Sequence, residues 1–261
     1  MCTLIALDRT VPGAPLVVAA NRDEYFDRAA SGPQLQETPG GPILAPLDLR
    51  AGGTWLGLNP HGVFAAVTNR RSVFVDSDRR SRGQLVLDAL AGRTATEGAK
   101  RIAEAPEAAF NPFNFFIADT ESAFVVTYED RASVCELEPG VHMVGNGEPD
   151  DRNDPKAARI LEQAEKSAMR GRDFVLDELA MTCAEHDCGG GPLGDTCVHT
   201  PSYGTRSSLL MVLGAGHGDD RLLYADGAPC RTPYQDFTSL LPELTQMADY
   251  EAGENSARSA I

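Results

Sequence analysis

Apolar residues in this chain form short runs, and segments with helical periodicity separate these runs into clusters. Apolar runs bounded by turn residues predict β-strands, whereas apolar residues spaced three and four apart predict amphipathic helices. Strands are predicted over residues 2–7, 16–20, 53–58, 62–68, 113–118, 123–128, 133–137, 141–145, 207–213 and 221–225. Asn59-Pro60-His61 predicts a hairpin turn between the third and fourth of these strands.

Four helices are predicted, and each follows a residue whose side chain can accept a hydrogen bond from the first helical turn. The expected capping residues are Ser81, Thr94 in a capping box with Glu97, Asp154 before Pro155, and Asp173. The order is strands, two helices, strands, two helices, strands, which is typical of antiparallel sheets with segregated helices. We therefore expect an α+β fold in which helices cover the sheets.

The length of the chain suits one large layered domain, because 261 residues without an internal repeat or an obvious linker can share one fold. We expect a single domain over residues 1–250. The segment over residues 251–261 is small and polar, so we expect it to form a flexible tail.

The composition excludes some classes of binding partner and indicates a cellular compartment. Acidic residues number 38 against 23 basic ones, and the net charge of −15 disfavours binding to nucleic acid or to an anionic membrane. The sequence has no apolar run long enough for a membrane span and no signal-peptide pattern, so a cytoplasmic location is expected. The six cysteines are then expected to be free thiols.

The second residue is a cysteine, and removal of Met1 would place a thiol and an α-amine on the same residue. An α-amine has a pKa of about 7.7–8.0, so a fraction of it is neutral near pH 7 and can accept the thiol proton. Cys2 would then supply both nucleophile and base, which is a known way to activate cysteine. The alternative is that Cys2 is a small apolar residue beginning a buried strand.

Other polar residues flank predicted strands, where a rigid backbone can hold catalytic side chains. Residues 21–24 follow the second strand and are typical of either a turn or a site, in which Asp23 could orient the terminal amine. Asn69 ends an apolar strand, where its amide could donate to an oxyanion or simply terminate the strand. Arg206 precedes the last hairpin and would be costly to bury unpaired, so we expect it to face a carboxylate or a pocket.

These segments together resemble the NRDE family, also called the transport and Golgi organisation 2 family. The resemblance rests on Met1-Cys2, Asn21-Arg22-Asp23-Glu24, Gly52–Gly57, Asn111-Pro112-Phe113-Asn114 and Tyr203–Ser208. It extends from Cys2 to about Thr232. The resemblance implies the N-terminal nucleophile (Ntn) hydrolase fold, a four-layer αββα sandwich.

The family is also distantly similar to choloylglycine hydrolases and penicillin V acylases, which cleave amides with an N-terminal cysteine. This similarity implies a catalytic set of Cys2, Asp23, Asn69, Asn146 and Arg206. Neighbouring residues are then expected to bind substrate, namely Asn21, Arg22, Trp55, Arg70 and Tyr203. The motif of those enzymes has an arginine where this chain has Ala20.

The implied mechanism needs no cofactor. The Cys2 thiolate attacks an amide or ester carbonyl, Asn69 and Asn146 stabilise the oxyanion, and water then hydrolyses the thioester. The resemblance therefore implies a hydrolase of a small amide or related acyl bond. The alternative is a non-catalytic protein on the same fold that binds a small molecule, with haem handling or acyl-CoA and lipid metabolism as roles proposed for the family.

Two further clusters bear on ligands and metals. Five arginines could attract an anionic ligand to the site, or could lie in a solvated loop balanced by acidic neighbours: Arg70, Arg71, Arg79, Arg80 and Arg82. Cysteine and histidine are dense at Cys183, His186, Cys188, Cys197 and His199. Cysteine and histidine at this density can bind Zn²⁺, but their spacing matches no named zinc module, so structural thiols and a loop histidine are the favoured interpretation and a metal site is the alternative.

Overall fold

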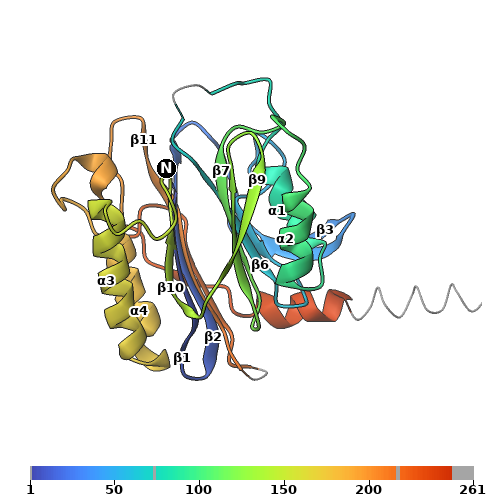
Figure 1. Cartoon of the computed structure of the whole chain (residues 1–261). Helices are drawn as coiled ribbons and strands as arrows, with labels where there is room; N and C mark the ends of the chain where they lie inside the picture. Colours follow the sequence, from blue (N-terminus) through green and yellow to red (C-terminus); the bar gives the residue numbers. More distant parts are fainter. Residues whose placement is uncertain (1, 73–74, 216–217, 249–261) are drawn as a thin grey trace, which may run out of the picture.

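Two antiparallel β-sheets lie face to face, and a pair of helices covers the outer face of each sheet (Figure 1). The computed structural model describes residues 2–72, 75–215 and 218–248. The expected α+β class and the four-layer αββα sandwich are both confirmed. No helix within these described ranges is long and apolar enough to cross a membrane.

The first sheet combines strands from the start of the chain with strands from its second half. Its strand order is β10-β1-β2-β11-β12-β13. The strands are β1 (Thr3–Val11), β2 (Ala14–Tyr25), β10 (Gly140–Val144), β11 (Tyr203–Leu213), β12 (Arg221–Ala225) and β13 (Gln235–Asp236). Helices α3 (Pro155–Met169) and α4 (Arg172–Ala184) cover its outer face (Figure 1).

The second sheet is built from the middle of the chain and follows the sequence order β3 to β9 without a crossover. Its strands are β3 (Gln34–Thr38), β4 (Gly41–Ala45), β5 (Leu56–Leu58), β6 (Phe64–Asn69), β7 (Phe113–Ala118), β8 (Ala123–Tyr128) and β9 (Ala132–Leu137). Helices α1 (Gly83–Leu90) and α2 (Ala95–Ala103) cover this sheet.

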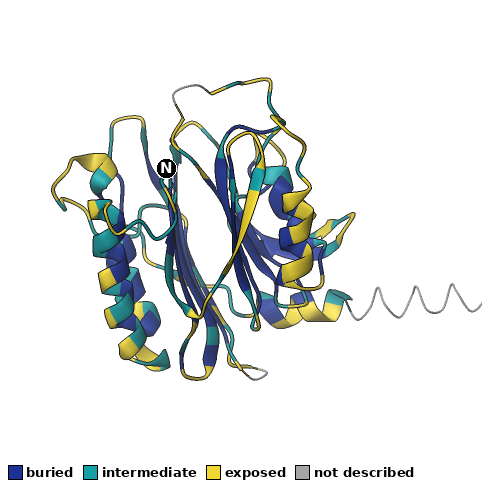
Figure 2. Cartoon of the chain, viewed as in Figure 1, coloured by how far each residue is buried: buried dark blue, intermediate teal, exposed yellow. Residues whose placement is uncertain are grey.

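Strand alternation divides the apolar side chains between three layers of core. On β1, Leu4 and Ala6 pack between the two sheets, whereas Ile5 and Leu7 pack against α3 and α4. A third cluster lies between the second sheet and helices α1 and α2. Buried residues therefore follow both faces of each sheet, and exposed residues lie on the outer faces of the helices, in loops and on strand β9 (Figure 2).

The capping predictions are confirmed at two helices and wrong at one. Thr94 accepts a hydrogen bond from the Glu97 N–H at 3.2 Å, and Asp154 accepts from the N–H of Lys156 at 2.8 Å. Asp173 lies inside the first turn of α4, which starts after Gly171 in a left-handed conformation with φ 79°. Glycine makes this conformation accessible without the steric cost of a Cβ atom, so the chain turns there without a side-chain cap.

Three departures from the sequence prediction concern strand and helix extent. The polar segment over residues 21–24 lies within β2 and is not a turn at its end. Strands β3 and β4 and a helix over residues 240–248 are additional elements. Ser81 accepts from the Gly83 N–H at 3.3 Å, although α1 itself begins at Gly83. The predicted tail over residues 251–261 lies outside the described residues.

Gly53 allows the segment before β5 to approach the start of α1. A Cβ atom at this position would lie 2.7 Å from the carbonyl carbon of Gly83 and 2.8 Å from its oxygen. Both are backbone atoms, so Gly53→Ala is expected to lower the free energy of unfolding by about 1–3 kcal/mol. Chemical denaturation measures this change, with Gly147→Ala as the matched control, because nothing lies within 4 Å of a Cβ atom there. Equal midpoints for the two variants would contradict the prediction.

Candidate active site

Cys2 lies directly before β1, at the end of the sandwich where the label N stands in Figure 1. It borders two hollows. A large cavity of about 300 Å³ is lined by residues of both sheets and by the segment before α1. A small pocket of about 30 Å³ lies between Cys2, the residues after β10 and the start of α3. A reactive group on Cys2 would therefore have space on two sides.

Strand pairing and the cavity linings place four predicted site residues around Cys2. Thr3 pairs with Asn21 on β2, so one further step of the register sets Arg22 beside Cys2. Leu4 pairs with Val144 on β10, so the same continuation brings Asn146 to the other side of Cys2. Asn69 and Asp23 line the large cavity together with Cys2, and Asn146 lines the small pocket with it.

The Cys2 thiol is held in a protein environment that favours its neutral form. Burial raises the pKa of this thiol above its ordinary value, and a hydrogen bond with the Asp23 backbone acts in the opposite direction. The net effect keeps the thiol protonated near neutral pH. Formation of the thiolate therefore needs a base close to the sulfur, and an α-amine on Cys2 would supply one.

Asp23 is positioned from both its side chain and its backbone. Thr205 donates its hydroxyl to Asp23 Oδ1 at 2.6 Å, and Tyr203 donates its hydroxyl to the Asp23 carbonyl at 2.9 Å. Thr205 in turn accepts from the Val198 N–H at 2.8 Å. Asp23 is only 3% exposed, and this burial raises the pKa of its carboxyl to about 6. The carboxyl is thus fixed in place and titrates close to physiological pH.

Asn69 and Asn146 come from different sheets and are tied together. Asn146 donates from Nδ2 to the Asn69 carbonyl, and the Arg71 N–H donates to the Asn146 carbonyl at 2.8 Å. Thr68 adds a bond from its hydroxyl to the Gly145 carbonyl at 2.6 Å. The second sheet therefore holds the loop that follows β10, and each of the two asparagines lines a hollow that Cys2 also borders.

Asn114 secures the same loop from β7 and was not singled out as a site residue from the sequence. Its side chain is fully buried, and Nδ2 donates to the carbonyls of Gly145 at 3.0 Å and Gly147 at 2.8 Å. Its Oδ1 accepts from Arg70, which also pairs with Glu148. Arg70, expected to bind substrate, thus braces the loop and lines neither hollow.

Three other predicted site residues also line neither hollow. Asn21 faces the helical layer, where its amide donates to the carbonyls of Cys183 at 2.8 Å and Thr196 at 2.9 Å. Tyr203 does not face either hollow, and instead holds the Asp23 backbone through its hydroxyl. Arg206 lies at an irregularity in the pairing of β11 with β2 and donates to the carbonyls of Tyr25 and Phe26. Its expected carboxylate or pocket is replaced by these backbone oxygens.

Three of the arginines that line the large cavity are not paired with a carboxylate among the described residues. Arg22 stacks over Trp55, with 4.2 Å between the guanidinium carbon and the ring centroid, and exposed Arg80 lies 5.2 Å from the Phe110 ring. Arg82 donates to a backbone carbonyl. Within the described part of the chain, none of these three forms an ion pair with a carboxylate. They remain available to an anionic group, and guanidinium forks suit carboxylates and phosphates.

Burial lowers the pKa of two cations beside the cavities, and one of them, Lys156, was not singled out from the sequence. Burial lowers the pKa of Arg82, which lines the large cavity near Cys2. Burial likewise lowers the pKa of Lys156, whose charge faces Asp23 from the small pocket. Lys156 lies in the first turn of α3, directly after the N-cap residue Asp154 and Pro155. No sequence pattern marks such a position as functional.

Comparison with known proteins adds the family. The sequence matches the model of the Transport and Golgi organisation 2 family over residues 1–217. The chain belongs to this family. Its curated relatives include Transport and Golgi organization protein 2 homologs from Homo sapiens, 28% identical over 233 residues, and from Bos taurus, 27% identical over 234 residues. Each alignment spans 77% of this chain and 83% of the relative, so the family resemblance inferred from the motifs is confirmed.

Solved structures identify the fold. A Caenorhabditis elegans ortholog of N-acylethanolamine-hydrolyzing acid amidase aligns with a TM-score of 0.55 at 14% identity, covering 81% of this chain and 92% of that chain. A mutant of the conjugated bile acid hydrolase from Clostridium perfringens aligns with a TM-score of 0.54 at 13% identity, covering 92% and 93%. At these identities the likeness shows the fold alone, and the predicted Ntn-hydrolase type of sandwich is confirmed.

Proposed function

We propose that this chain is an N-terminal nucleophile hydrolase that cleaves an amide or related acyl bond in a small anionic molecule. The observation that carries the proposal is the position of Cys2. The residue lies at the start of β1, between two hollows, with Asp23, Asn69 and Asn146 around it. The Ntn-hydrolase fold provides the framework in which such a residue acts as the nucleophile.

In the proposed reaction, removal of Met1 frees the α-amine of Cys2, which takes the thiol proton. The thiolate forms a bond to the carbonyl carbon, and the charge on the carbonyl oxygen is stabilised by amide N–H groups of Asn69 and Asn146. Asn146 uses one N–H on the Asn69 carbonyl and retains the other. The C–N bond then breaks as the ammonium returns its proton to the leaving amine, and water hydrolyses the acyl thioester to a carboxylic acid.

Asp23 acts as a positioning group in this scheme. Its buried carboxyl is fixed by Thr205 and lies near the cation of Lys156. With a pKa raised to about 6 by burial, the carboxylate form predominates above that pH. It then stabilises the ammonium that forms on the terminal amine when the thiol is deprotonated.

The arginines of the large cavity define the substrate class. Arg22 shares a face of β2 with Ala20, because the two positions are two residues apart on a strand. It thus brings a guanidinium to the face from which the choloylglycine hydrolase motif presents its arginine. Arg22, Arg80 and Arg82 together suit a carboxylate or phosphate on the acyl substrate.

Arg22→Gln is expected to raise KM for a carboxylate-bearing amide by about 10-fold or more, because hydrogen bonds to charged groups contribute about 1.5–3 kcal/mol. Steady-state kinetics on a matched pair of amides, one with a carboxylate and one with a methyl ester, measures the effect. Arg93→Gln is the control, since Arg93 is exposed and lines neither hollow. An equal increase for both amides would show that Arg22 supports the fold of the cavity and does not recognise charge.

The proposal is tested by the intact mass of the purified protein and by acid-quenched reactions with a panel of N-acyl amides. A mass lacking one methionine and an acyl adduct on Cys2 are the expected results. Retention of Met1, or an acyl cap on the terminal amine, would remove the proposed base and overturn the hydrolase assignment. Saturable binding of anionic ligands without turnover would then favour the non-catalytic alternative, which uses the same arginines.

A further inference from the structure

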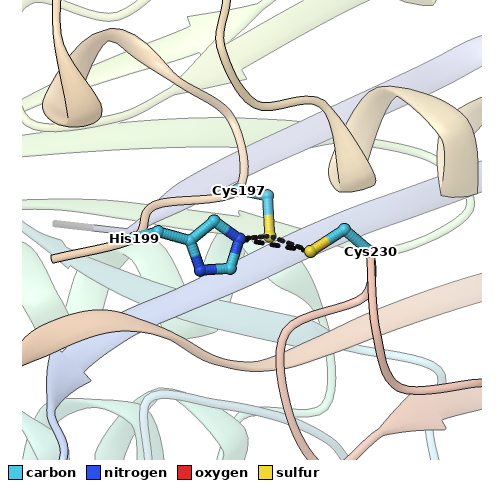
Figure 3. A group of neighbouring side chains, drawn as sticks. All are labelled: Cys197, His199 and Cys230. Carbon is cyan, nitrogen blue, oxygen red and sulfur yellow. Dashed lines mark hydrogen bonds between the residues drawn. The ribbon is translucent and has the colours of Figure 1, made fainter.

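Three side chains outside the proposed active site point toward one another with the composition of a metal site. Cys197, His199 and Cys230 bring two sulfur atoms and one imidazole nitrogen within 4.8 Å of each other (Figure 3). This group differs from the cysteine and histidine cluster seen in the sequence. Cys197 and His199 belong to that cluster, whereas Cys230 comes from a turn after β12 and was not part of it.

The backbone on each side fixes how these ligands meet. His199 forms an isolated antiparallel bridge with Gly204, and the Thr205 N–H donates to the Val198 carbonyl at 2.9 Å. The segment is therefore extended, and residues two apart project to the same side. Cys197 and His199 thus face one side together, and the turn at Ala228–Thr232 places Cys230 opposite them.

The separations between the three atoms match a tetrahedral zinc ion. With Zn–S of about 2.3 Å and Zn–N of about 2.0–2.1 Å, tetrahedral angles set two sulfurs about 3.8 Å apart and a sulfur and nitrogen about 3.6 Å apart. The Cys197 and Cys230 sulfurs are 3.7 Å apart, and the Cys197 sulfur is 3.6 Å from His199 Nε2. The distance from His199 Nε2 to the Cys230 sulfur, 3.2 Å, is shorter by about 0.4 Å.

We propose that Cys197, His199 and Cys230 bind one Zn²⁺ ion as a Cys₂His site with a fourth position left for water. Two thiolates and an imidazole are ligands that zinc prefers, and three protein ligands plus water is an established zinc arrangement. Cys197 is fully buried, while His199 and Cys230 are partly exposed, so the ion would reach the site from the side of those two residues.

The site would also stiffen the neighbourhood of Asp23. Val198, between the two ligands of the extended segment, donates its N–H to Thr205, whose hydroxyl donates to Asp23. A bound ion would fix Cys197 and His199 to Cys230 and thereby hold this chain of hydrogen bonds in one arrangement. Binding to the folded state alone raises the melting temperature, which gives a readout that does not depend on the proposed hydrolase activity.

The test uses the full-length protein without a histidine tag, purified under reducing conditions. Elemental analysis of the isolated protein and titration of the metal-free protein with Zn²⁺ against a chromogenic chelator give stoichiometry and affinity. Substitution with Co²⁺ reports the ligands, because thiolate-to-cobalt charge transfer requires sulfur coordination. We expect one Zn²⁺ per chain, tetrahedral Co²⁺ bands and a higher melting temperature with Zn²⁺.

Cys230→Ser and His199→Gln are expected to weaken Zn²⁺ binding by more than the 10–100-fold that loss of an outer-shell partner causes. Both residues are partly exposed, so these variants test the site with less risk to folding than a change at buried Cys197. Cys135→Ser and His61→Gln are the controls, since both residues are exposed on the second sheet or its turns. Circular dichroism of the metal-free variants verifies that they fold.

Three results would exclude a metal site at these residues, and a fourth would contradict the choice of zinc. The first is the absence of stoichiometric uptake by wild-type protein at saturating Zn²⁺, and the second is equal affinity in wild type and Cys230→Ser. The third is a Cys197–Cys230 disulfide in protein isolated without reductant, detected by peptide mapping, with no metal bound after reduction. Recovery of stoichiometric copper(I) in place of zinc would also contradict the choice of ion, because thiolates bind both metals.

Discussion

Cys2→Ala is expected to reduce amide turnover by at least about 10³-fold while leaving the fold and ligand binding intact. Loss of a covalent nucleophile removes the pathway through the acyl intermediate, and nucleophile substitutions in other hydrolases have effects of this size or larger. Cys2 precedes β1 and borders open space on two sides, so the smaller side chain leaves the strand register unchanged. The measurement is kcat on the amide identified by the substrate panel.

Two further variants make the Cys2 result specific. Cys188→Ala removes a thiol that lines neither hollow and should retain wild-type kcat. Cys2→Ser keeps a weaker nucleophile at the same position and should leave the Kd for an anionic substrate analogue within about two-fold of wild type, since the arginines that bind the anion are unchanged. Full turnover by Cys2→Ala would exclude Cys2 as the nucleophile.

Asp23→Asn is expected to stabilise the protein at high pH and to leave its stability nearly unchanged at low pH. Burial raises the pKa of Asp23 from 3.8 to about 6 in the folded state, so its neutral form is the favoured one. The contribution of this group to stability is fully present below pH 4 and is lost as the pH rises through about 6. At pH 8 the free energy of unfolding should increase by up to about 3 kcal/mol in the variant, because one pKa unit corresponds to 1.36 kcal/mol.

Denaturant titrations between pH 4 and pH 8 measure the Asp23→Asn effect. Asparagine retains an oxygen that can accept the Thr205 hydroxyl, so that hydrogen bond is preserved. Asp48→Asn is a control of opposite sign: burial favours a raised pKa at Asp48, but the bonds from Arg28 and two backbone N–H groups outweigh it and lower the pKa. That variant should lose stability at pH 8 and less at low pH, and a pH-independent difference for Asp23→Asn would contradict the prediction.

The stability gained by Asp23→Asn should be accompanied by lower activity. A neutral amide cannot stabilise the ammonium that forms on the Cys2 amine, so kcat is expected to fall in the same variant. Destabilising buried charges at active sites are a common form of the trade-off between stability and function. The charged carboxyl of Asp23 lowers the stability of the fold, yet Thr205 binds its side chain and Tyr203 binds its backbone. This arrangement is consistent with the proposed role of Asp23.

The site residues show how far sequence reasoning reached. The motif resemblance placed Cys2, Asp23, Asn69 and Asn146 together, and the structure brings all four to the same end of the sandwich. The sequence did not predict the directions of other side chains, because these depend on where each strand ends and where its pairing is irregular. Residues 21–24 continue β2, so Asn21 faces the helices while Arg22 faces the space between the sheets. An irregularity in β11 likewise sends Arg206 toward backbone carbonyls.

Long-range pairing explains the residues that the sequence did not reveal. Asn114 and Gly145 are 31 positions apart, and Cys197 and Cys230 are 33 positions apart. No local pattern connects such residues, because they meet only after distant strands have paired. Lys156 is an ordinary surface residue type by sequence, and only the burial found in the fold lowers its pKa.

Sequence alone was enough to predict the strand and helix periodicity, the caps at Thr94 and Asp154, the α+β class and the cysteine at position 2. These features depend on neighbours within a few residues, where spacing and local hydrogen bonds control conformation. Sequence reasoning could not assign which polar groups face Cys2 and which hold the loops in place. That outcome depends on sheet order, on side-chain direction at strand ends and on desolvation, all of which arise from contacts between distant segments.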